Sequence, residues 1–318
     1  MLDKNGRNIE YLRVSLTDRC NLRCIYCMPE CGIDKIKHSD ILRFEETLRI
    51  IKVFASLGIK KVRFTGGEPL ILKGIEKLIH DTSNIPSIED ISITTNGILL
   101  SDMASDLKKT GLKRVNISLD TLSKDKFKFI TRGGNIDKVL DAIDKCLTIG
   151  LEPVKINMVL IRGINDGEIQ DFLSLAINNP VHVRIIELMP IGEGQKFYKD
   201  GMMTTDEIIS SMTNLIPVDD KSSTAKVYRT EGSKGTIGFI SPLSCKFCSN
   251  CNRIRLTSTG IVKPCLHSKE EINIKSFLDN EVLLTSVVKN AIYEKPSEHN
   301  MEFSGVSNNN KMMYQMGG

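Results

Sequence analysis

The sequence predicts a mixed α/β fold: a partial (β/α)6 barrel of the TIM type, followed by a C-terminal extension. Strand-like runs alternate with helix-like segments from residue 11 to about residue 190. Such alternation implies parallel strands joined by right-handed crossovers. Within each strand-like run, apolar and polar residues also alternate. The strands of an open sheet covered on both faces usually read as continuous apolar runs, so the barrel is favoured over an open doubly wound sheet.

The expected elements follow one another in a regular order. The strand-like runs cover residues 11–17, 60–66, 90–97, 114–120, 153–161 and 181–189, and the helix-like segments cover residues 45–58, 75–83, 103–111, 136–150 and 168–178. Three helices end in a glycine shortly before the next strand, as helix C-caps do: Gly58, Gly111 and Gly150. Later we expect a helix at 204–214, a hairpin within 222–241, a helix within 275–293 and a mobile tail over the last twenty residues.

The alternation within the strands also predicts a ligand. Period two places the apolar residues on one face, under the helices, and the polar residues on the other face, toward the barrel lumen. Several lumen positions are basic: Arg13, Lys61, Arg63, Lys155 and Arg184. Buried cations need partners, and a strongly anionic ligand would supply them, with a polyphosphate fitting best.

Length and composition exclude several classes of protein. A chain of 318 residues can bury a large core as one barrel-sized domain or as a domain with an appendage. No apolar run approaches the roughly 20 residues that span a bilayer, and the first residues lack the apolar stretch of a secretory signal. The net charge of +4 is modest and scattered, which argues against a nucleic-acid binder. We therefore expect a cytoplasmic protein.

Nine cysteines in a reducing compartment are not expected to form a disulfide framework. One group, Cys20, Cys24 and Cys27, follows the first strand and is here called the first triad. Three thiolates suit a [4Fe–4S] cluster with one iron left open for another ligand. Zinc, which prefers four ligands, is the alternative, with Cys31 as the fourth.

A second group of cysteines lies near residue 250. Cys248, Cys251 and Cys265, here called the second triad, lie close to Cys245, and these four could also form a zinc ribbon or a closed cluster. Cys146 stands alone in a helix-like stretch, and we expect it to be a buried apolar residue.

The first triad resembles the C-x3-C-x2-C signature of the radical S-adenosylmethionine (SAM) superfamily, with aromatic Tyr26 between its last two cysteines. The stretch TGGEP, from Thr65 to Pro69, follows the second strand, as the corresponding motif does in that superfamily. The resemblance implies that the open iron binds SAM. It further implies that the SAM contacts are Tyr26, Gly67, Ser118 and Met189.

The second triad resembles one branch of that superfamily, the GTP 3′,8-cyclases of the molybdenum cofactor biosynthesis protein A family. The shared pattern is C-x2-C-x13-C with Asn-Arg-x-Arg directly after its second cysteine, and a terminal Gly317-Gly318. The resemblance implies a second [4Fe–4S] cluster on the second triad, whose open iron binds guanine, with Cys245 outside the motif. It implies these GTP contacts: Arg13, Lys61, Arg63, Thr94, Lys155, Arg184, Arg253 and Arg255. Arg13 is also expected to assist the last step of the reaction.

The implied activity is the radical cyclisation of GTP to (8S)-3′,8-cyclo-7,8-dihydroguanosine 5′-triphosphate, a lyase reaction early in molybdenum cofactor biosynthesis. The implied division is a core over residues 1–200 and a C-terminal region over 201–318 with the second cluster, the guanine site and the Gly-Gly tail. Expected partners are an electron donor and the next enzyme of the molybdopterin pathway, and a homodimer is possible. The rival hypotheses are a peptide-modifying radical SAM enzyme with an auxiliary cluster and a non-enzymatic module with two zinc sites.

Overall fold

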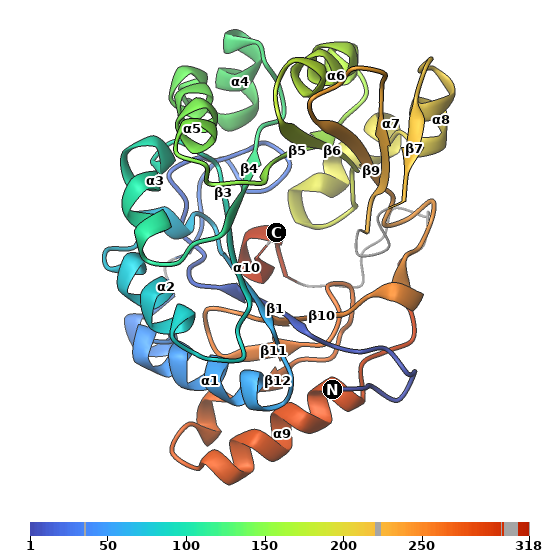
Figure 1. Cartoon of the computed structure of the whole chain (residues 1–318). Helices are drawn as coiled ribbons and strands as arrows, with labels where there is room; N and C mark the ends of the chain where they lie inside the picture. The colour runs from blue at the N-terminus through green and yellow to red at the C-terminus, as the bar shows by residue number, and fades with distance from the viewer. Residues whose placement is uncertain (35, 220–223, 300, 302–310, 318) are drawn as a thin grey trace.

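The computed structural model describes residues 1–34, 36–219, 224–299, 301 and 311–317, and its centre is a run of six parallel strands (Figure 1). These are β1 (Tyr11–Ser15), β2 (Lys61–Thr65), β3 (Asp90–Thr95), β4 (Arg114–Ser118), β5 (Val154–Leu160) and β6 (Val181–Glu187). Each strand pairs in parallel with the next one along the chain. The predicted partial barrel is confirmed.

The helices between these strands lie outside the curved sheet (Figure 1). They are α1 (Phe44–Ser56), α2 (Ile75–Ser83), α3 (Leu100–Lys109), α4 (Lys124–Thr131), α5 (Ile136–Thr148) and α6 (Ile169–Asn178). Gly58, Gly111 and Gly150 follow the ends of α1, α3 and α5 with φ of +98°, +103° and +66°. The predicted glycine caps are therefore confirmed, because a left-handed residue just beyond a helix end favours glycine.

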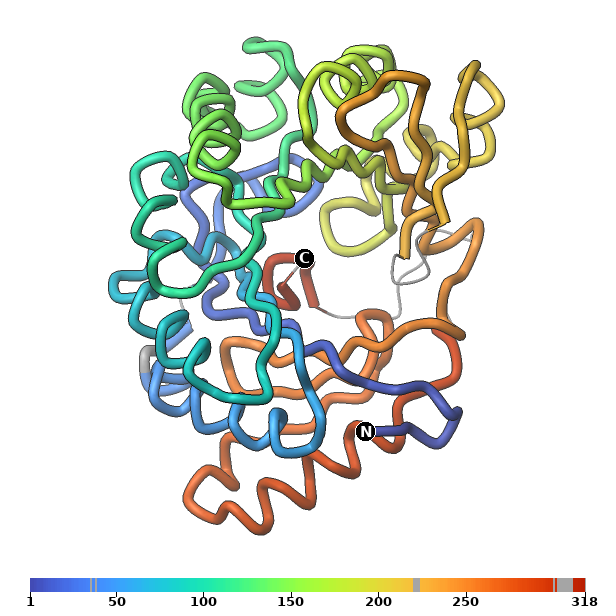
Figure 2. The backbone as a smooth tube through the Cα atoms, in the orientation of Figure 1, coloured from blue at the N-terminus to red at the C-terminus, as the bar shows by residue number. Residues whose placement is uncertain are grey.

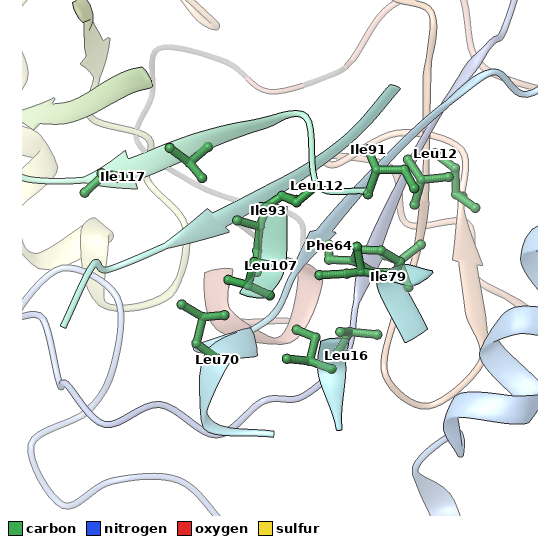
Figure 3. Packing of buried hydrophobic residues seen from close by; sticks show 14 of the residues in the cluster. Leu12, Leu16, Phe64, Leu70, Ile79, Ile91, Ile93, Leu107, Leu112 and Ile117 are labelled. Carbon is green, nitrogen blue, oxygen red and sulfur yellow. The ribbon is translucent and has the colours of Figure 1, made fainter. Parts of the chain in front are cut away.

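The apolar face of each strand packs under these helices. Figure 3 shows Phe64 and Ile93 of neighbouring strands together with Ile79 of α2 and Leu107 of α3, all of them buried. Cys146 of α5 is fully buried in the same cluster, as expected. Since the outer face of the sheet is filled by apolar side chains, the opposite parity of each strand is left to face the lumen.

The C-terminal region extends the same sheet at both edges. Its strands are β7 (Ile216–Val218), β8 (Lys226–Arg229), β9 (Thr236–Ile240), β10 (Arg253–Leu256), β11 (Ile261–Lys263) and β12 (Ile272–Asn273). Among the described residues, the sheet has the order β12-β11-β10-β1-β2-β3-β4-β5-β6-β9-β8-β7. β10 pairs in parallel with β1, and β9 pairs in parallel with β6. Residues on either side of the predicted boundary at 200 thus share one sheet, while the boundary itself stays a prediction.

The remaining helices are short, apart from α9. They are α7 (Gln195–Gly201), α8 (Thr205–Ser210), α9 (Glu281–Tyr293) and α10 (Met313–Met316), with single 3-10 turns at η1 (His38–Asp40), η2 (Pro69–Ile71), η3 (Asp166–Glu168), η4 (Gly192–Gly194), η5 (Cys248–Asn250) and η6 (Lys275–Phe277). The sequence predicted α8, α9 and the β8–β9 hairpin but not α4 or α7. In the part of the chain that the structure describes, no helix combines the length and apolar character needed to cross a bilayer.

The expectation of a mobile tail is wrong for the described residues 311–317. α10 lies inside the curve of the sheet (Figure 2), and its Tyr314 and Met316 are buried. Met316 belongs to a small apolar cluster with Leu188 and Ile191, which follow β6. The apolar side chains of MMYQM thus hold this short segment, although Asn and Ser dominate the sequence before it. Residues 302–310 and Gly318 lie outside the described residues.

We predict that Gly235→Ala destabilises the joint between β6 and β9. A Cβ atom at residue 235 would lie 2.0 Å from the Val181 carbonyl oxygen and 2.8 Å from that of Asn179. Both atoms are backbone, so the strands themselves must move, and the free energy of unfolding should fall by about 2 kcal/mol or more. The urea midpoint checks this. Gly167→Ala is the matched control, because a Cβ there meets nothing within 4 Å, and an equal loss in both variants would contradict the explanation.

Candidate active site

The lumen of the curved sheet opens into a cavity of about 310 Å³, a size typical of small-molecule sites. Its walls come from the polar parity of the strands, from the loop after β1 and from residues 242–267 of the C-terminal region. Met313 and Tyr314 of α10 complete it from inside the barrel. Segments far apart in the sequence therefore meet at one cavity.

The cavity brings together all but two of the site residues predicted from the sequence. It is lined by Arg13, Cys20, Cys24, Tyr26, Cys27, Arg63, Gly67, Thr94, Ser118, Arg184, Met189, Cys248, Cys251, Arg253, Arg255 and Cys265. Lys61 and Lys155 do not line it. Both lie near the amino ends of their strands, β2 and β5, and Lys61 instead forms an ion pair with Glu10 at 3.5 Å. The alternation placed both lysines on the lumen face of their strands. It could not predict how far along the strand each lysine lies from the cavity.

Three arginines lie side by side across the lumen face. Arg13 of β1 is in register with Arg255 of β10 on one side and with Arg63 of β2 on the other, and we call these three the arginine row. Neighbouring strands are about 4.8 Å apart, and like charges directly opposite each other are destabilising. The row is therefore a concentration of positive charge that the strand pairing itself imposes.

This crowding is reflected in the arginine pKa values. Burial and the neighbouring Arg255 and Arg63 hold the pKa of Arg13 well below its usual value. Burial and Arg253 lower the pKa of Arg255 to about 10, and burial and Arg63 lower that of Arg184 to about 10. With pKa values of about 10, Arg184 and Arg255 still carry their charge near pH 7. A polyanion in the cavity would relieve both the desolvation and the repulsion.

Tyr11, which the sequence analysis did not select, helps to orient these cations. Its ring lies under the guanidinium groups of Arg63 and Arg253, at 5.4 and 5.9 Å from the ring centroid. The Arg63 Nε also donates a hydrogen bond to the Ser92 Oγ (3.2 Å), and an Arg253 Nη2 donates to the Thr224 Oγ1 (2.6 Å). Tyr11 looks like an ordinary strand residue in the sequence, and only the register Tyr11–Arg253 reveals its position.

Several buried polar atoms of the lumen have no hydrogen-bond partner among the described residues. They are the Thr94 Oγ1, both amide atoms of Asn116 and the Asn157 Oδ1. All three residues line the cavity. A buried polar atom without a partner costs free energy, so these atoms indicate a ligand with hydrogen-bonding groups.

The glycines of the TGGEP stretch allow the cysteine loop to approach β2. A Cβ at residue 67 would lie 2.3 Å from the Arg19 carbonyl oxygen, and a Cβ at residue 66 would lie 2.6 Å from that of Thr17. The Gly67 N–H donates to the Thr17 oxygen at 2.6 Å. The absence of side chains at residues 66 and 67 thus lets the segment that leads into the first triad pack directly against the end of β2.

The first triad lies in an electronegative environment. Burial raises the pKa of Cys20 to about 11 and that of Cys27 to about 12, and the carboxylate of Asp120 contributes to the rise at Cys24 and Cys27. The Asp120 Oδ2 accepts a hydrogen bond from the Tyr26 hydroxyl at 2.7 Å. A positively charged group bound by these thiolates would be strongly favoured here.

The second triad lies in an electropositive environment. Burial raises the pKa of Cys251, but Lys295 and Arg253, with a smaller effect of Arg7, more than offset it, so the pKa lies below the usual thiol value. Lys295 lines the cavity and is almost fully buried, and His267 and His299 lie beside it, 4.7 Å apart between ring centroids. The sequence analysis missed these three residues, because they lie in irregular segments without a spacing pattern.

The thiols of each triad fit an iron–sulfur cluster. All six are free thiols that line the cavity, and within each triad they influence one another electrostatically. Yet no three His, Cys, Asp or Glu side chains of the described residues are gathered in the way a single metal ion requires. A single zinc ion holds each of its cysteine sulfurs about 2.3 Å from the same metal centre. In a four-iron cluster each cysteine binds a different iron, so the sulfurs lie further from one another. Cys31 and Cys245 are exposed and do not line the cavity.

The C-terminal segment reaches the arginine row. An Arg255 Nη1 donates to the carbonyl oxygens of Met316 (3.2 Å) and Gly317 (2.8 Å). Gly317 has φ of +70°, and a Cβ there would lie 2.2 Å from the Thr65 Oγ1, so only glycine fits. The amide of Tyr314 meanwhile faces the Cys27 thiol. This segment therefore connects the arginine row with the first triad.

Comparisons with known proteins agree with this geometry. The radical SAM superfamily model matches residues 14–176, and the model for molybdenum cofactor synthesis C matches residues 181–301. The solved structure of Streptococcus suis SuiB bound to its precursor peptide SuiA is similar, with a TM-score of 0.65 and 15% identity over 92% of this chain and 66% of that one. The SAM-bound form of SuiB gives a TM-score of 0.63 over 86% of this chain and 65% of that one, also at 15% identity. At this identity the likeness concerns the fold alone.

The curated relatives are much closer in sequence. The GTP 3′,8-cyclase of Clostridium botulinum (strain Langeland) is 60% identical over 319 residues, and that of Clostridium acetobutylicum is 54% identical over 319 residues. The GTP 3′,8-cyclase of Alkaliphilus oremlandii is 49% identical over 320 residues. In each case the match covers 100% of this chain and 100% of the relative. The chain belongs to the GTP 3′,8-cyclase family of the radical SAM superfamily.

Proposed function

We propose that this chain converts GTP into (8S)-3′,8-cyclo-7,8-dihydroguanosine 5′-triphosphate, as a GTP 3′,8-cyclase of molybdenum cofactor biosynthesis. The observation that carries the proposal is that both cysteine triads and the arginine row line one cavity. A nucleoside triphosphate matches this combination. Its phosphates carry the negative charge that would balance the cationic arginines, and its base can reach the second triad.

The first triad would hold a [4Fe–4S] cluster beside the SAM site. Membership of the radical SAM superfamily implies SAM and such a cluster. When bound, the cluster would supply the electron for the reductive cleavage of SAM on which the radical chemistry at the ribose depends. Tyr26, Gly67, Ser118 and Met189 are the proposed SAM contacts. The Asp120 carboxylate fixes the Tyr26 hydroxyl, so the aromatic ring has a defined position.

The second triad would hold a second [4Fe–4S] cluster at the guanine site. Its position beside Lys295 and Arg253 lowers the pKa of Cys251 and so favours the thiolate that metal binding requires, whereas burial raises the pKa of Cys248. Phe247 and His267 also line this part of the cavity and provide flat surfaces for a purine. This arrangement supports binding of the base at the second triad while the phosphates extend toward the arginine row.

The arginines would hold the triphosphate and thereby place the ribose. Arg13, Arg63, Arg184, Arg253 and Arg255 are the proposed contacts, with Thr94 as a hydrogen-bond donor or acceptor. Holding a substrate at both ends can account for a large part of a rate enhancement. Lys61 and Lys155 do not line the cavity. Their contact with GTP remains a prediction.

Arg13 has a proposed role at the end of the reaction. Closing the C3′–C8 bond leaves an unpaired electron on the base, and one electron and one proton complete the product. Arg13 lies at the centre of the arginine row, and its depressed pKa makes it a better proton donor than an ordinary arginine. The electron donor, the next enzyme of the pathway and a homodimer remain predictions that concern partners.

The first test follows GTP-dependent chemistry. Anaerobically reconstituted protein receives reductant, SAM and GTP, with ATP in a parallel sample, and mass spectrometry follows 5′-deoxyadenosine and the nucleotide product. We expect 5′-deoxyadenosine together with a cyclised isomer of GTP, and no such isomer from ATP. SAM cleavage that is indifferent to GTP would contradict the proposal and favour a peptide-modifying enzyme. Zinc without acid-labile sulfide would favour the non-enzymatic module.

The second test removes the centre of the arginine row. We expect Arg13→Ala to lower product formation by about 100-fold or more, because a misplaced substrate loses this much rate, while both clusters keep their iron. Arg162→Ala is the control, since Arg162 forms an exposed ion pair with Glu207 at 2.6 Å away from the cavity. Loss of iron in Arg13→Ala would overturn the assigned role.

A further inference from the structure

A buried turn at the N-terminus lies behind the second triad. The Asp3 side chain is fully buried, and its Oδ1 accepts hydrogen bonds from the amides of Asn5 (3.0 Å) and Arg7 (2.8 Å). Its Oδ2 accepts from the Arg7 Nε at 2.7 Å. An ion pair removed from water is costly unless its remaining donors are hydrogen-bonded. The N–H groups of Arg7 that do not contact Asp3 therefore need other acceptors.

Those N–H groups reach two separate segments. The Arg7 Nη1 donates to the carbonyl oxygens of Cys248 and Ser297, both at 2.9 Å. The Arg7 Nη2 donates to the oxygens of Pro296 (2.6 Å) and Lys295 (3.3 Å). One guanidinium thus joins the peptide of a second-triad cysteine to the segment that follows α9. The fixed fork of an arginine suits such a junction, and a lysine cannot reproduce it.

Lys295 continues the connection to another cysteine of the triad. Its side chain is almost fully buried, and its Nζ donates to the Pro264 carbonyl oxygen at 2.6 Å, directly before Cys265. The Asn5 Nδ2 holds the Lys295 oxygen from the other side at 2.8 Å. Among the residues that the structure describes, no carboxylate is bonded to this buried ammonium, so its positive charge favours anions nearby.

The third cysteine is tied to the same N-terminal segment. The oxygen of Asn252, directly after Cys251, accepts hydrogen bonds from the amides of Glu10 (3.3 Å) and Tyr11 (3.2 Å). The backbone beside each cysteine of the second triad is therefore bonded to residues 3–11 or to Lys295. The first triad has no comparable contact with this turn among the described residues, because its loop packs on residues 65–68 and 130–131 instead.

We propose that Arg7, held by Asp3, positions the second triad for its cluster and that Lys295 raises the reduction potential of that cluster. This inference rests on the proposed second cluster and assigns positioning residues for it. Asp3 balances the charge of Arg7, whereas the buried ammonium of Lys295 behind the thiolates stabilises the reduced, more negative state and so raises the potential. The hydrogen bonds of Arg7 and Lys295 to the peptides fix the spacing that the cluster needs.

The experiment separates the two triads within the full chain. In one parent, serines replace Cys20, Cys24 and Cys27, so only the second triad can bind a cluster; in the other, serines replace Cys248, Cys251 and Cys265. Each parent receives Arg7→Met, Lys295→Met or Lys295→Arg. After anaerobic reconstitution, iron and sulfide per chain are measured, and a redox titration followed by electron paramagnetic resonance gives the potential. Lys4→Met is the matched control, because its exposed ion pair with Glu294 joins the same two segments.

We expect Arg7→Met to lower iron at the second triad at least threefold and to leave iron at the first triad unchanged. Lys295→Met should lower the potential of the second cluster, Lys295→Arg should restore it, and Lys4→Met should change neither. Equal iron loss at both triads would mean that Arg7 only supports folding, and this would overturn the inference. So would an unchanged potential and unchanged iron in both Met variants. If the parent with an intact second triad binds no cluster, the proposed second cluster fails together with this inference.

Discussion

Arg255, Arg13 and Arg63 lie side by side on three hydrogen-bonded strands, and their mutual repulsion is the constraint on which the rest of the structure depends. Backbone pairing holds the three guanidinium groups on one face whether or not an anion is present. Neighbouring groups moderate the cost, among them the Tyr11 ring, the Ser92 hydroxyl and the carbonyl oxygens of the C-terminal segment. A cavity built around such a row is stable because apolar packing on the opposite face of the sheet offsets the repulsion.

The constraint arises only because the C-terminal region adds β10 to the edge of the barrel at β1. This pairing brings Arg255 beside Arg13, and the segments before β10 and after β11 carry the second triad to the same cavity. The two triads then differ in their electrostatic surroundings. Carboxylates lie near the first, while cations lie near the second. The two triads therefore share one lumen without having equivalent surroundings.

The sequence predicted the barrel because strand–helix alternation and glycine caps such as Gly111 depend on local backbone preferences. Alternation also predicted that Arg13, Arg63 and Arg184 face the lumen. Depth along a strand was not predictable, since Lys61 shares that parity yet lies at the strand's amino end. The contacts of Arg7 and Lys295 were equally out of reach, because both run through backbone carbonyls: Arg7 bonds to Ser297, 290 positions away, and Lys295 bonds to Pro264, 31 positions away. Such contacts leave no spacing pattern in a single sequence.

The most direct test of this account removes Arg184, a buried cation that Arg63 of the row repels, and compares the thermal stability of Arg184→Met with that of the wild-type protein at equal cluster loading. Removing one crowded cation should raise the ligand-free melting temperature by about 1–2 °C, since this corresponds to roughly 1 kcal/mol in a chain of this size. The rise in melting temperature on adding GTP should become smaller than in the wild type. Arg162→Met, at an exposed ion pair, should change neither value. A lower ligand-free melting temperature for Arg184→Met with an undiminished response to GTP would contradict the account.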